Sequence, residues 1–299
     1  MDAIGLRKLL LTLQQLDGVT DTSLRKMILC RTFDELSSID PEKIVAWLKC
    51  NLRFFSRTKE KILSLTPVSL IEAKEKGEAI ERSSRDKGIG ILSYFDADYP
   101  SRFREMALSK RVDFPVILYF KGNVALLNAP KTVAIIGTRN PSPKAVEVGL
   151  DVARRVSADG NVVISGLAEG CDTIGHKGCI EAGGKTIAIV GTSLDTVYPK
   201  SNSALEKEIL LRDGLILSEY PVGYKTTPYS FVLRDRLQAA LSDAVIVVQT
   251  SKNGGTMHAA TDAVSVYRKT LMVISPSRIE DGDTDGNEFL IKEYGAKQL

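Results

Sequence analysis

The sequence has few of the side chains that bind metals or form cross-links. Its 299 residues include four cysteines, none in C-x-x-C spacing, and two histidines that lie far apart, His176 and His258. This pattern favours neither a zinc site nor a disulfide framework, and we expect the cysteines to be reduced thiols. The sequence therefore predicts no structural metal and no cofactor.

Long apolar runs are missing as well. No stretch reaches the roughly 18 to 20 uncharged apolar residues that span a bilayer. The first 15 residues, MDAIGLRKLLLTLQQ, are too short and too interrupted for a secretory signal. We therefore expect a cytoplasmic protein. A hydrophobic content of 43% is enough for the core of one large domain or two ordinary ones.

The sequence also carries little excess charge of one sign. Its formal net charge is +3, and residues 131–299 hold 19 Lys and Arg against 20 Asp and Glu. No broad basic face can be inferred from this balance. If this region binds nucleic acid, it must do so through a few well-placed cations and backbone amides.

The first 86 residues are predicted to form a helical domain, similar to SAM or helix-hairpin-helix domains. Apolar residues recur at helical spacing in 6–16, 23–29, 41–55 and 71–85. Between residues 88 and 130 the pattern changes to short apolar runs broken by turn residues, which are typical of strands. We therefore expect a second domain over residues 87–299.

From residue 131 the sequence alternates strand-like and helix-like segments. Apolar, β-branched runs predict buried strands at 131–136, 161–165, 185–190, 214–218, 243–248 and 270–275. Helices are predicted at 143–158, 173–182, 203–212, 232–241 and 256–268. This alternation indicates an α/β fold with a doubly wound, mainly parallel, Rossmann-like sheet. Ligands of such sheets bind at the carboxyl ends of the strands, where the strand order reverses.

The turn after the first of these strands has the composition of an anion site. It contains Gly137, Thr138, Arg139 and Ser142, and it leads into a helix. Glycine allows close approach of the backbone, the first N–H groups of a helix are expected to be free, and a guanidinium suits phosphate oxygens. The turn lacks both G-x-G-x-x-G and G-K-[ST], which disfavours dinucleotide-binding and P-loop functions.

Two further turns are predicted to reach the same edge of the sheet. Ser165 and Gly166 follow the second strand, and Asp172 is expected to cap the next helix. After the third strand, the segment YPKSN brings a second cation, Lys200, and a side-chain amide, Asn202.

Several segments in their order resemble the DNA-processing A (DprA, also called Smf) family. They are GTRNPS, SGLAEGCD, YPKSN, SEYPVG and FVLRDR, preceded by DADYPSRFREM and FPVILYFKGN, so that the similarity covers roughly residues 90–299. The resemblance implies single-stranded DNA binding during DNA uptake and recombination, delivery of that DNA to the RecA recombinase, homodimerisation, and no chemical step.

The resemblance also implies roles for individual residues. Arg139 and Lys200 would contact phosphates, and Arg234 and Arg236 correspond to the family's Arg-Asn-Arg element. Residues two apart on a helix point to nearly opposite sides, so we expect only one of these two arginines to face DNA. The remaining expected binding residues are Gly137, Thr138, Ser142, Ser165, Gly166 and Asn202. Asp235 replaces the family's asparagine and places a carboxylate where phosphates would approach.

Two other functions remain open at this point. A DprA-like antitoxin or anti-phage defence protein would use the same fold to neutralise a neighbouring toxin. A nucleotide-sensing Rossmann-like module would use the NGGT turn at residues 253–256, which resembles part of the motif of phosphoribohydrolases. Hydrolysis is not expected, because Ala259 stands where that motif requires glutamate.

Overall fold

The computed structural model describes residues 2–30, 33, 41–51, 58–106, 113–279 and 282–299. The chain divides into two compact units, Met1–Leu118 and Tyr119–Leu299. The domain boundary expected after residue 86 stays a prediction. None of the helices in the described ranges combines the length and apolarity that crossing a bilayer requires.

The first unit is mainly helical, as the sequence predicts. Its elements are α1 (Ala3–Gln14), α2 (Asp21–Leu29), α4 (Pro41–Asn51), α5 (Lys59–Ser64), α6 (Pro67–Asp86), β1 (Gly90–Ser93) and α7 (Ser101–Met106). The predicted helix 41–55 is seen as far as Asn51, and residues 52–55 lie outside the described ranges.

Helix α6 illustrates how the sequence forms the first unit. Thr66 and Ser69 make a reciprocal capping box, and Pro67 occupies the first turn, where its missing N–H leaves no hydrogen bond unmade. Gly77 lets α6 approach α1 closely, since a β-carbon at this position would lie 3.3 Å from the backbone of Leu11. The two helices pack against each other along this contact.

The second unit is a doubly wound α/β sheet, which confirms the predicted fold class. Its strands are β2 (Ile117–Gly122, which begins in the first unit), β3 (Thr132–Ile136), β4 (Val162–Ser165), β5 (Thr186–Ile189), β6 (Leu215–Ser218), β7 (Ala244–Val247), β8 (Thr270–Val273) and β9 (Lys297–Gln298). Its helices are η1 (Val124–Asn128), α8 (Pro143–Ala158), α9 (Cys171–Glu181), η2 (Lys200–Asn202), α10 (Ser203–Leu211), α11 (Pro228–Leu241), α12 (Thr256–Ser265), α13 (Pro276–Ile279) and α14 (Asp285–Tyr294).

The strand order in this unit is β2-β6-β5-β4-β3-β7-β8-β9. All its neighbouring strands run parallel except β2 and β6, which are antiparallel. Successive strands from β3 to β6 extend the sheet in one direction, and the chain then returns so that β7 pairs with β3 on the other side. The strand order therefore reverses at β3 and β7, which is where a ligand site is expected.

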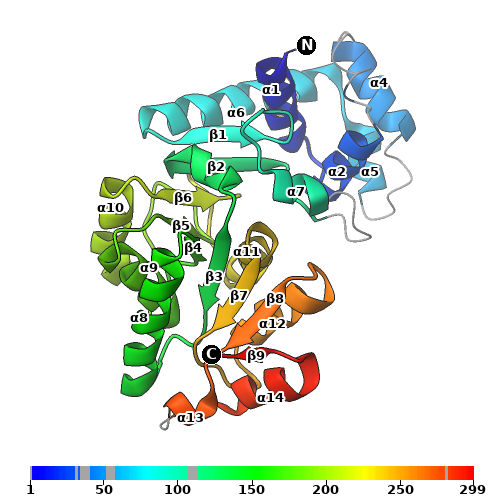
Figure 1. Ribbon diagram of the computed structural model, residues 1–299. Coiled ribbons are helices and arrows are strands. Elements are labelled where there is room, and N and C mark those ends of the chain that lie inside the picture. Colours follow the sequence, from blue (N-terminus) through cyan, green and yellow to red (C-terminus); the bar gives the residue numbers. More distant parts are fainter. Residues whose placement is uncertain (1, 31–32, 34–40, 52–57, 107–112, 280–281) are drawn as a thin grey trace. The chain divides into compact units, whose positions relative to one another are not determined.

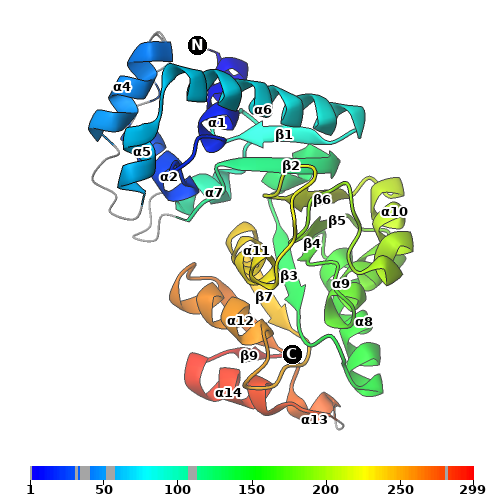
Figure 2. The same ribbon diagram turned by 180° about the vertical axis from the view of Figure 1, so that it is seen from behind.

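Helices cover both faces of this sheet. Helices α8, α9 and α10 lie on one face, and α11, α12 and α14 lie on the other (Figures 1 and 2). Between the sheet and α8 and α9, a buried apolar cluster includes Ile135, Val163, Ala153, Cys171 and Cys179. The continuous apolar runs of the sequence are thus explained by strands that are buried on both faces.

Candidate nucleic-acid interface

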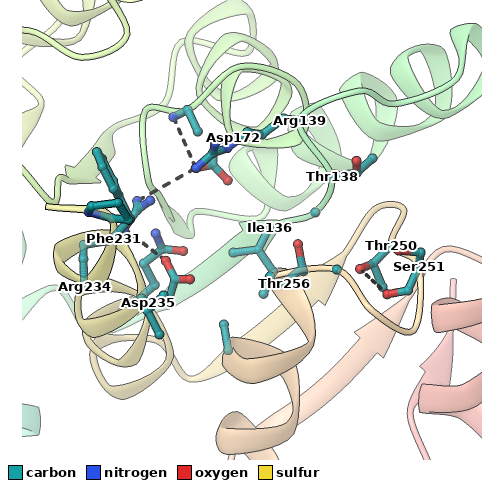
Figure 3. A pocket seen from close by; sticks show the side chains of 18 of the residues that line it. Ile136, Thr138, Arg139, Asp172, Phe231, Arg234, Asp235, Thr250, Ser251 and Thr256 are labelled. Carbon is teal, nitrogen blue, oxygen red and sulfur yellow. Dashed lines mark hydrogen bonds and ion pairs between the residues drawn. The ribbon is translucent and has the colours of Figure 1, made fainter.

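A cavity of about 600 Å³ opens at the carboxyl ends of β3 and β7. Its walls come from the turn after β3, the start of α9, one face of α11, and the turn between β7 and α12 (Figure 3). The lining residues are Ile136, Gly137, Thr138, Arg139, Ala168, Asp172, Tyr198, Pro228, Phe231, Val232, Arg234, Asp235, Gln238, Thr250, Ser251, Gly254, Gly255, Thr256 and Ala259. The predicted turns after β3 and β4 thus contribute to one site, through Arg139 and Ala168. The YPKSN segment, the third predicted turn, contributes Tyr198.

The turn after β3 is held by Gln249, which follows β7. Gln249 O accepts a hydrogen bond from Thr138 N at 2.8 Å, and Gln249 Oε1 accepts one from Ser142 N at 2.8 Å. Gly137 lies so close to this segment that a β-carbon would come within 2.8 Å of Gln249 O. Glycine is required here by close packing within the protein.

The backbone amides of this turn are largely used inside the protein. Thr138 N and Ser142 N bind Gln249, and Asn140 N donates to Thr138 Oγ1 at 3.2 Å. The backbone amides of these three turn residues are therefore not free to bind an anion. Ser142 itself caps α8, because its hydroxyl accepts a hydrogen bond from Ala145 N at 3.1 Å. Gly137, Thr138 and Ser142 shape the turn, and they leave anion binding to side chains.

Arg139 is the exposed cation of the cavity. Its guanidinium makes no hydrogen bond or ion pair with the residues that the structure describes. It lies near the carboxylates of Asp172 and Asp235, whose pKa values are raised by burial, and its positive charge opposes part of that rise. In Figure 3, Arg139 and Asp172 lie on one side of the cavity, and Thr250 and Ser251 on another. A phosphate oxygen could therefore reach this guanidinium without displacing a protein partner.

The second turn forms the support of a buried arginine. Ser165 is fully buried, and its hydroxyl donates to Ile135 O at 2.6 Å. Gly166 leaves the space that the guanidinium of Arg234 occupies. Arg234 Nη1 donates to Ile189 O at 2.7 Å and lies 3.9 Å from Asp172 Oδ2. Gly166 therefore makes room for Arg234. The Ser165 hydroxyl is bonded within the protein and is not exposed to a ligand.

Asp172 does not cap α9, contrary to the sequence expectation. The residue at the N-cap is Gly170, with φ 75°, and Asp172 lies inside the first turn. Its carboxylate accepts a hydrogen bond from Ala168 N at 3.2 Å. Burial raises the pKa of Asp172 above its usual range, and the positive charge of Arg234 opposes this shift.

Asp235 brings a second carboxylate to the same wall. Its Oδ1 lies 3.1 Å from Arg234 Nε as an ion pair, but Arg234 Nε makes no hydrogen bond. Burial raises the pKa of Asp235 to about 6, and the charge of Asp172 adds to the shift, while Arg234, Arg139 and His258 oppose it. The cavity wall therefore gains positive charge when Asp235 is protonated.

Lys200 and Asn202 lie on the short helix η2, outside the residues that line this cavity. Lys200 is exposed to solvent. Asn202 is buried, and its Nδ2 donates to Leu167 O at 2.8 Å and to Thr173 Oγ1 at 3.0 Å. Both amide hydrogens are thus used to hold the turn after β4. Tyr198 and Pro199, just before η2, line a small adjoining cavity together with Arg139.

Arg236 lies outside the residues that line the cavity, although it is two positions from Arg234. Its Nη1 and Nη2 each lie 2.7 Å from a carboxylate oxygen of Glu219. The side chains of Arg236 and Glu219 are only 10% and 13% exposed. Arg234 thus lies at the cavity. Arg236 instead forms a bidentate ion pair with Glu219, away from the residues that line the cavity.

The sequence did not single out Gln238 as a cavity residue. It lines the wall with Phe231, Arg234 and Asp235, since positions three and four apart share one face of a helix. Helical spacing from Arg234 could have identified it. Among the described residues, no group of three or more His, Cys, Asp or Glu side chains is placed to bind a metal ion.

Comparison with known proteins identifies the family to which this chain belongs. A family model for DNA recombination-mediator protein A matches residues 90–299. The chain belongs to this family. DNA processing protein DprA of Streptococcus pneumoniae is 38% identical over 190 residues, which make up 64% of this chain and 65% of that protein. DprA of Bacillus subtilis is 30% identical over 72% of this chain and 69% of the relative. The aligned region thus spans about two thirds of these DprA proteins.

Solved structures of the DprA family show the same fold. The structure of S. pneumoniae DprA matches with a TM-score of 0.68 and 28% identity, covering 94% of this chain and 95% of the other. A structure of Helicobacter pylori DprA, which concerns its single-stranded DNA binding mode, matches with a TM-score of 0.61 and 33% identity. That match covers 70% of this chain and 90% of the other. The resemblance seen in the sequence is confirmed.

Proposed function

We propose that this DprA family member binds single-stranded DNA at the cavity at the β3 and β7 strand ends. The observation that carries the proposal is Arg139, an exposed guanidinium with no protein partner among the described residues, at the wall of a cavity large enough for a nucleotide. The H. pylori relative, whose structure concerns single-stranded DNA binding, supports this ligand class. Arg139 contacts a phosphate, and the exposed Lys200 contacts another one along the strand.

The other residues named from the sequence act on DNA indirectly in this proposal. Gly137, Thr138 and Ser142 shape the turn that presents Arg139, and Ser165, Gly166 and Asn202 hold the neighbouring turn. Arg234 supplies positive charge at the cavity wall, where its guanidinium is largely buried and bonded to Ile189 O. Arg236, paired with Glu219, is not a DNA contact.

We propose that the protein performs no chemical step on DNA. Two groups near the cavity that could act as nucleophiles, the Ser165 hydroxyl and the Cys171 thiol, are in unreactive states. The Ser165 hydroxyl is buried and donates to Ile135 O, and burial raises the pKa of the Cys171 thiol to about 12, which keeps it protonated at neutral pH. The proposed role is therefore mediation, in which bound single strands are protected and delivered to the RecA recombinase.

Homodimerisation is proposed on the family resemblance. The apolar segment 243–274 adds no support for a dimer, because Val245, Ile246, Val247 and Ala260 are buried within the second unit. Light scattering at micromolar concentration tests the dimer, and a mass of one chain under all conditions would contradict it.

A binding titration tests the proposed function. The full chain is mixed with a fluorescent single strand, with the same strand annealed to its complement, and with each of these after Arg139→Ala substitution. We expect the parent protein to bind the single strand more tightly than the duplex, and the substitution to weaken that binding. A parent protein that binds neither DNA would overturn the proposal.

A further inference from the structure

The charged side chains that line the cavity cancel one another. Arg139 and Arg234 are positive, and Asp172 and Asp235 are negative when ionised, so the lining has two charges of each sign. A phosphate in such a cavity is attracted by each guanidinium and repelled by each carboxylate. The protonation states of the two carboxyl groups therefore decide whether the cavity attracts an anion.

Asp172 is fixed in the cavity wall. Its side chain is only 9% exposed, and its Oδ2 accepts a hydrogen bond from Ala168 N at 3.2 Å. The same oxygen lies 3.9 Å from Arg234 Nη1. Arg234 thus has one negative neighbour that does not depend on Asp235.

Asp235 is more accessible and less firmly held. Its side chain is 25% exposed, and its Oδ1 lies 3.1 Å from Arg234 Nε. This ion pair includes no hydrogen bond from Nε, and the stronger ion pairs are those joined by hydrogen bonds. Arg234 is also held by Ile189 O, which accepts a hydrogen bond from Nη1 at 2.7 Å. Loss of the negative charge on Asp235 would therefore leave the Arg234 guanidinium in place.

The groups that act on Asp235 come from four elements. They are Arg234 on α11 itself, Asp172 on α9, Arg139 in the turn after β3, and the exposed His258 on α12. Burial raises the pKa of Asp235 to about 6, Arg234 opposes the rise, and Asp172 adds to it. A phosphate bound beside Arg139 would bring another negative charge, which favours the protonated carboxyl.

We propose that the Asp235 carboxylate is an internal counter-ion that competes with DNA phosphate for the positive charge of the cavity, so that binding of single-stranded DNA is coupled to uptake of a proton by Asp235. This inference rests on the proposed function, in which Arg139 contacts a phosphate. It adds regulation by acidity, because two ligands that favour each other's binding do so by the same free energy. The proton and the strand are these two ligands.

The test measures the affinity of the full chain for oligothymidylate between pH 5.5 and 8 at constant ionic strength. Thymine bases and phosphodiesters neither gain nor lose protons in this range, so any change belongs to the protein. We expect binding about tenfold tighter at pH 5.5 than at pH 8, because a like charge is removed from beside the bound phosphate. Equal affinity at every pH would overturn the inference and leave the proposed function intact.

Asp235→Asn removes the charge and keeps the shape of the side chain. The variant should bind at pH 8 about as tightly as the parent protein at pH 5.5, with little dependence on pH. Glu169→Gln is the matched control, because it removes a carboxylate beside the adjoining cavity without changing α11. The control should keep the pH dependence of the parent protein. An Asp235→Asn protein with that same dependence would contradict the inference.

His258→Gln separates Asp235 from the nearby imidazole. Histidine side chains also change charge in this pH range, and a positive charge gained there would strengthen DNA binding too. We expect His258→Gln to keep the pH dependence. A dependence that disappears in His258→Gln and persists in Asp235→Asn would overturn the inference. Titration calorimetry at pH 7 in PIPES and in imidazole then counts the protons taken up, which should be fewer in Asp235→Asn than in the parent protein.

Sulfate tests the competition without DNA. The titration of the Asp235 carboxyl carbon is followed by NMR in sulfate and in chloride at equal ionic strength. Sulfate in the cavity should keep Asp235 protonated to higher pH. This result in a protein that binds no strand would support the competition and overturn the proposed DNA function. The same titration curve in both salts would contradict the inference.

Discussion

Gly166 and Arg234 occupy adjoining space so tightly that any β-carbon at residue 166 would overlap the Arg234 guanidinium. Gly166 begins the turn after β4, and Arg234 reaches it from α11, 68 positions later in the numbering. The guanidinium is fixed there by Ile189 O and is close to Asp172. The absence of a side chain at residue 166 thus allows a buried positive charge at the wall of the cavity.

Gly166→Ala should therefore destabilise the protein. The added methyl group forces the buried Arg234 side chain away from Ile189 O, and overpacking of this kind costs about 1–3 kcal/mol. Urea unfolding followed by circular dichroism measures the change in the free energy of unfolding. Gly255→Ala is the matched control, since a β-carbon at residue 255 would have no neighbouring atom within 4 Å and its φ is −57°. A loss of stability as large in the control as at residue 166 would contradict this explanation.

Arg236→Ala should lower stability and leave the affinity for single-stranded DNA unchanged. The substitution leaves the Glu219 carboxylate, which is 13% exposed, without its partner. Removing one partner of a buried ion pair lowers the free energy of unfolding by about 3–5 kcal/mol. The double variant with Glu219→Ala should recover part of the loss, because no unpaired charge then remains. Thermal unfolding and DNA titration measure the two effects. Weakened DNA binding by folded Arg236→Ala would show that this arginine is a contact.

Asp235 should make the free energy of unfolding depend on pH. Its pKa is raised to about 6 in the folded state, above the usual value of about 3.9 for an unfolded chain. The folded state thus holds its proton more tightly, so the contribution of Asp235 is fully present below about pH 4 and is lost as the pH rises through 6. Asp235→Asn should remove this loss. Urea titrations of both proteins between pH 4 and 7 measure it, and parallel curves would contradict the assignment.

Much of the second unit could be predicted from the sequence. Strands β3 to β8 begin and end within two residues of their predicted bounds, because strands buried on both faces carry continuous apolar runs. The position of the cavity followed from the parallel sheet, whose ligands bind where the strand order reverses. The family resemblance named the turns that reach this edge.

The details of the site could not be predicted, because they depend on contacts between distant residues. Nothing in the local sequence shows that Gln249 binds the backbone of Thr138 and Ser142, or that Glu219 pairs with Arg236. Asn287 on α14 is a further case. Its amide binds Thr250 N and Val248 O, and so holds the turn after β7 from a short helix that the sequence did not predict.

The salt dependence of DNA binding tests the phosphate role of Arg139 most directly. Affinity for single strands of mixed sequence is measured at several salt concentrations for the parent protein, Arg139→Ala and Lys200→Ala. Loss of one phosphate contact should weaken binding by a similar factor for every sequence and flatten the slope of log affinity against log salt by about 0.7, because fewer counterions are released. Arg139→Ala and Lys200→Ala proteins that bind as tightly as the parent with an unchanged slope would contradict the assignment of the cavity to DNA phosphates.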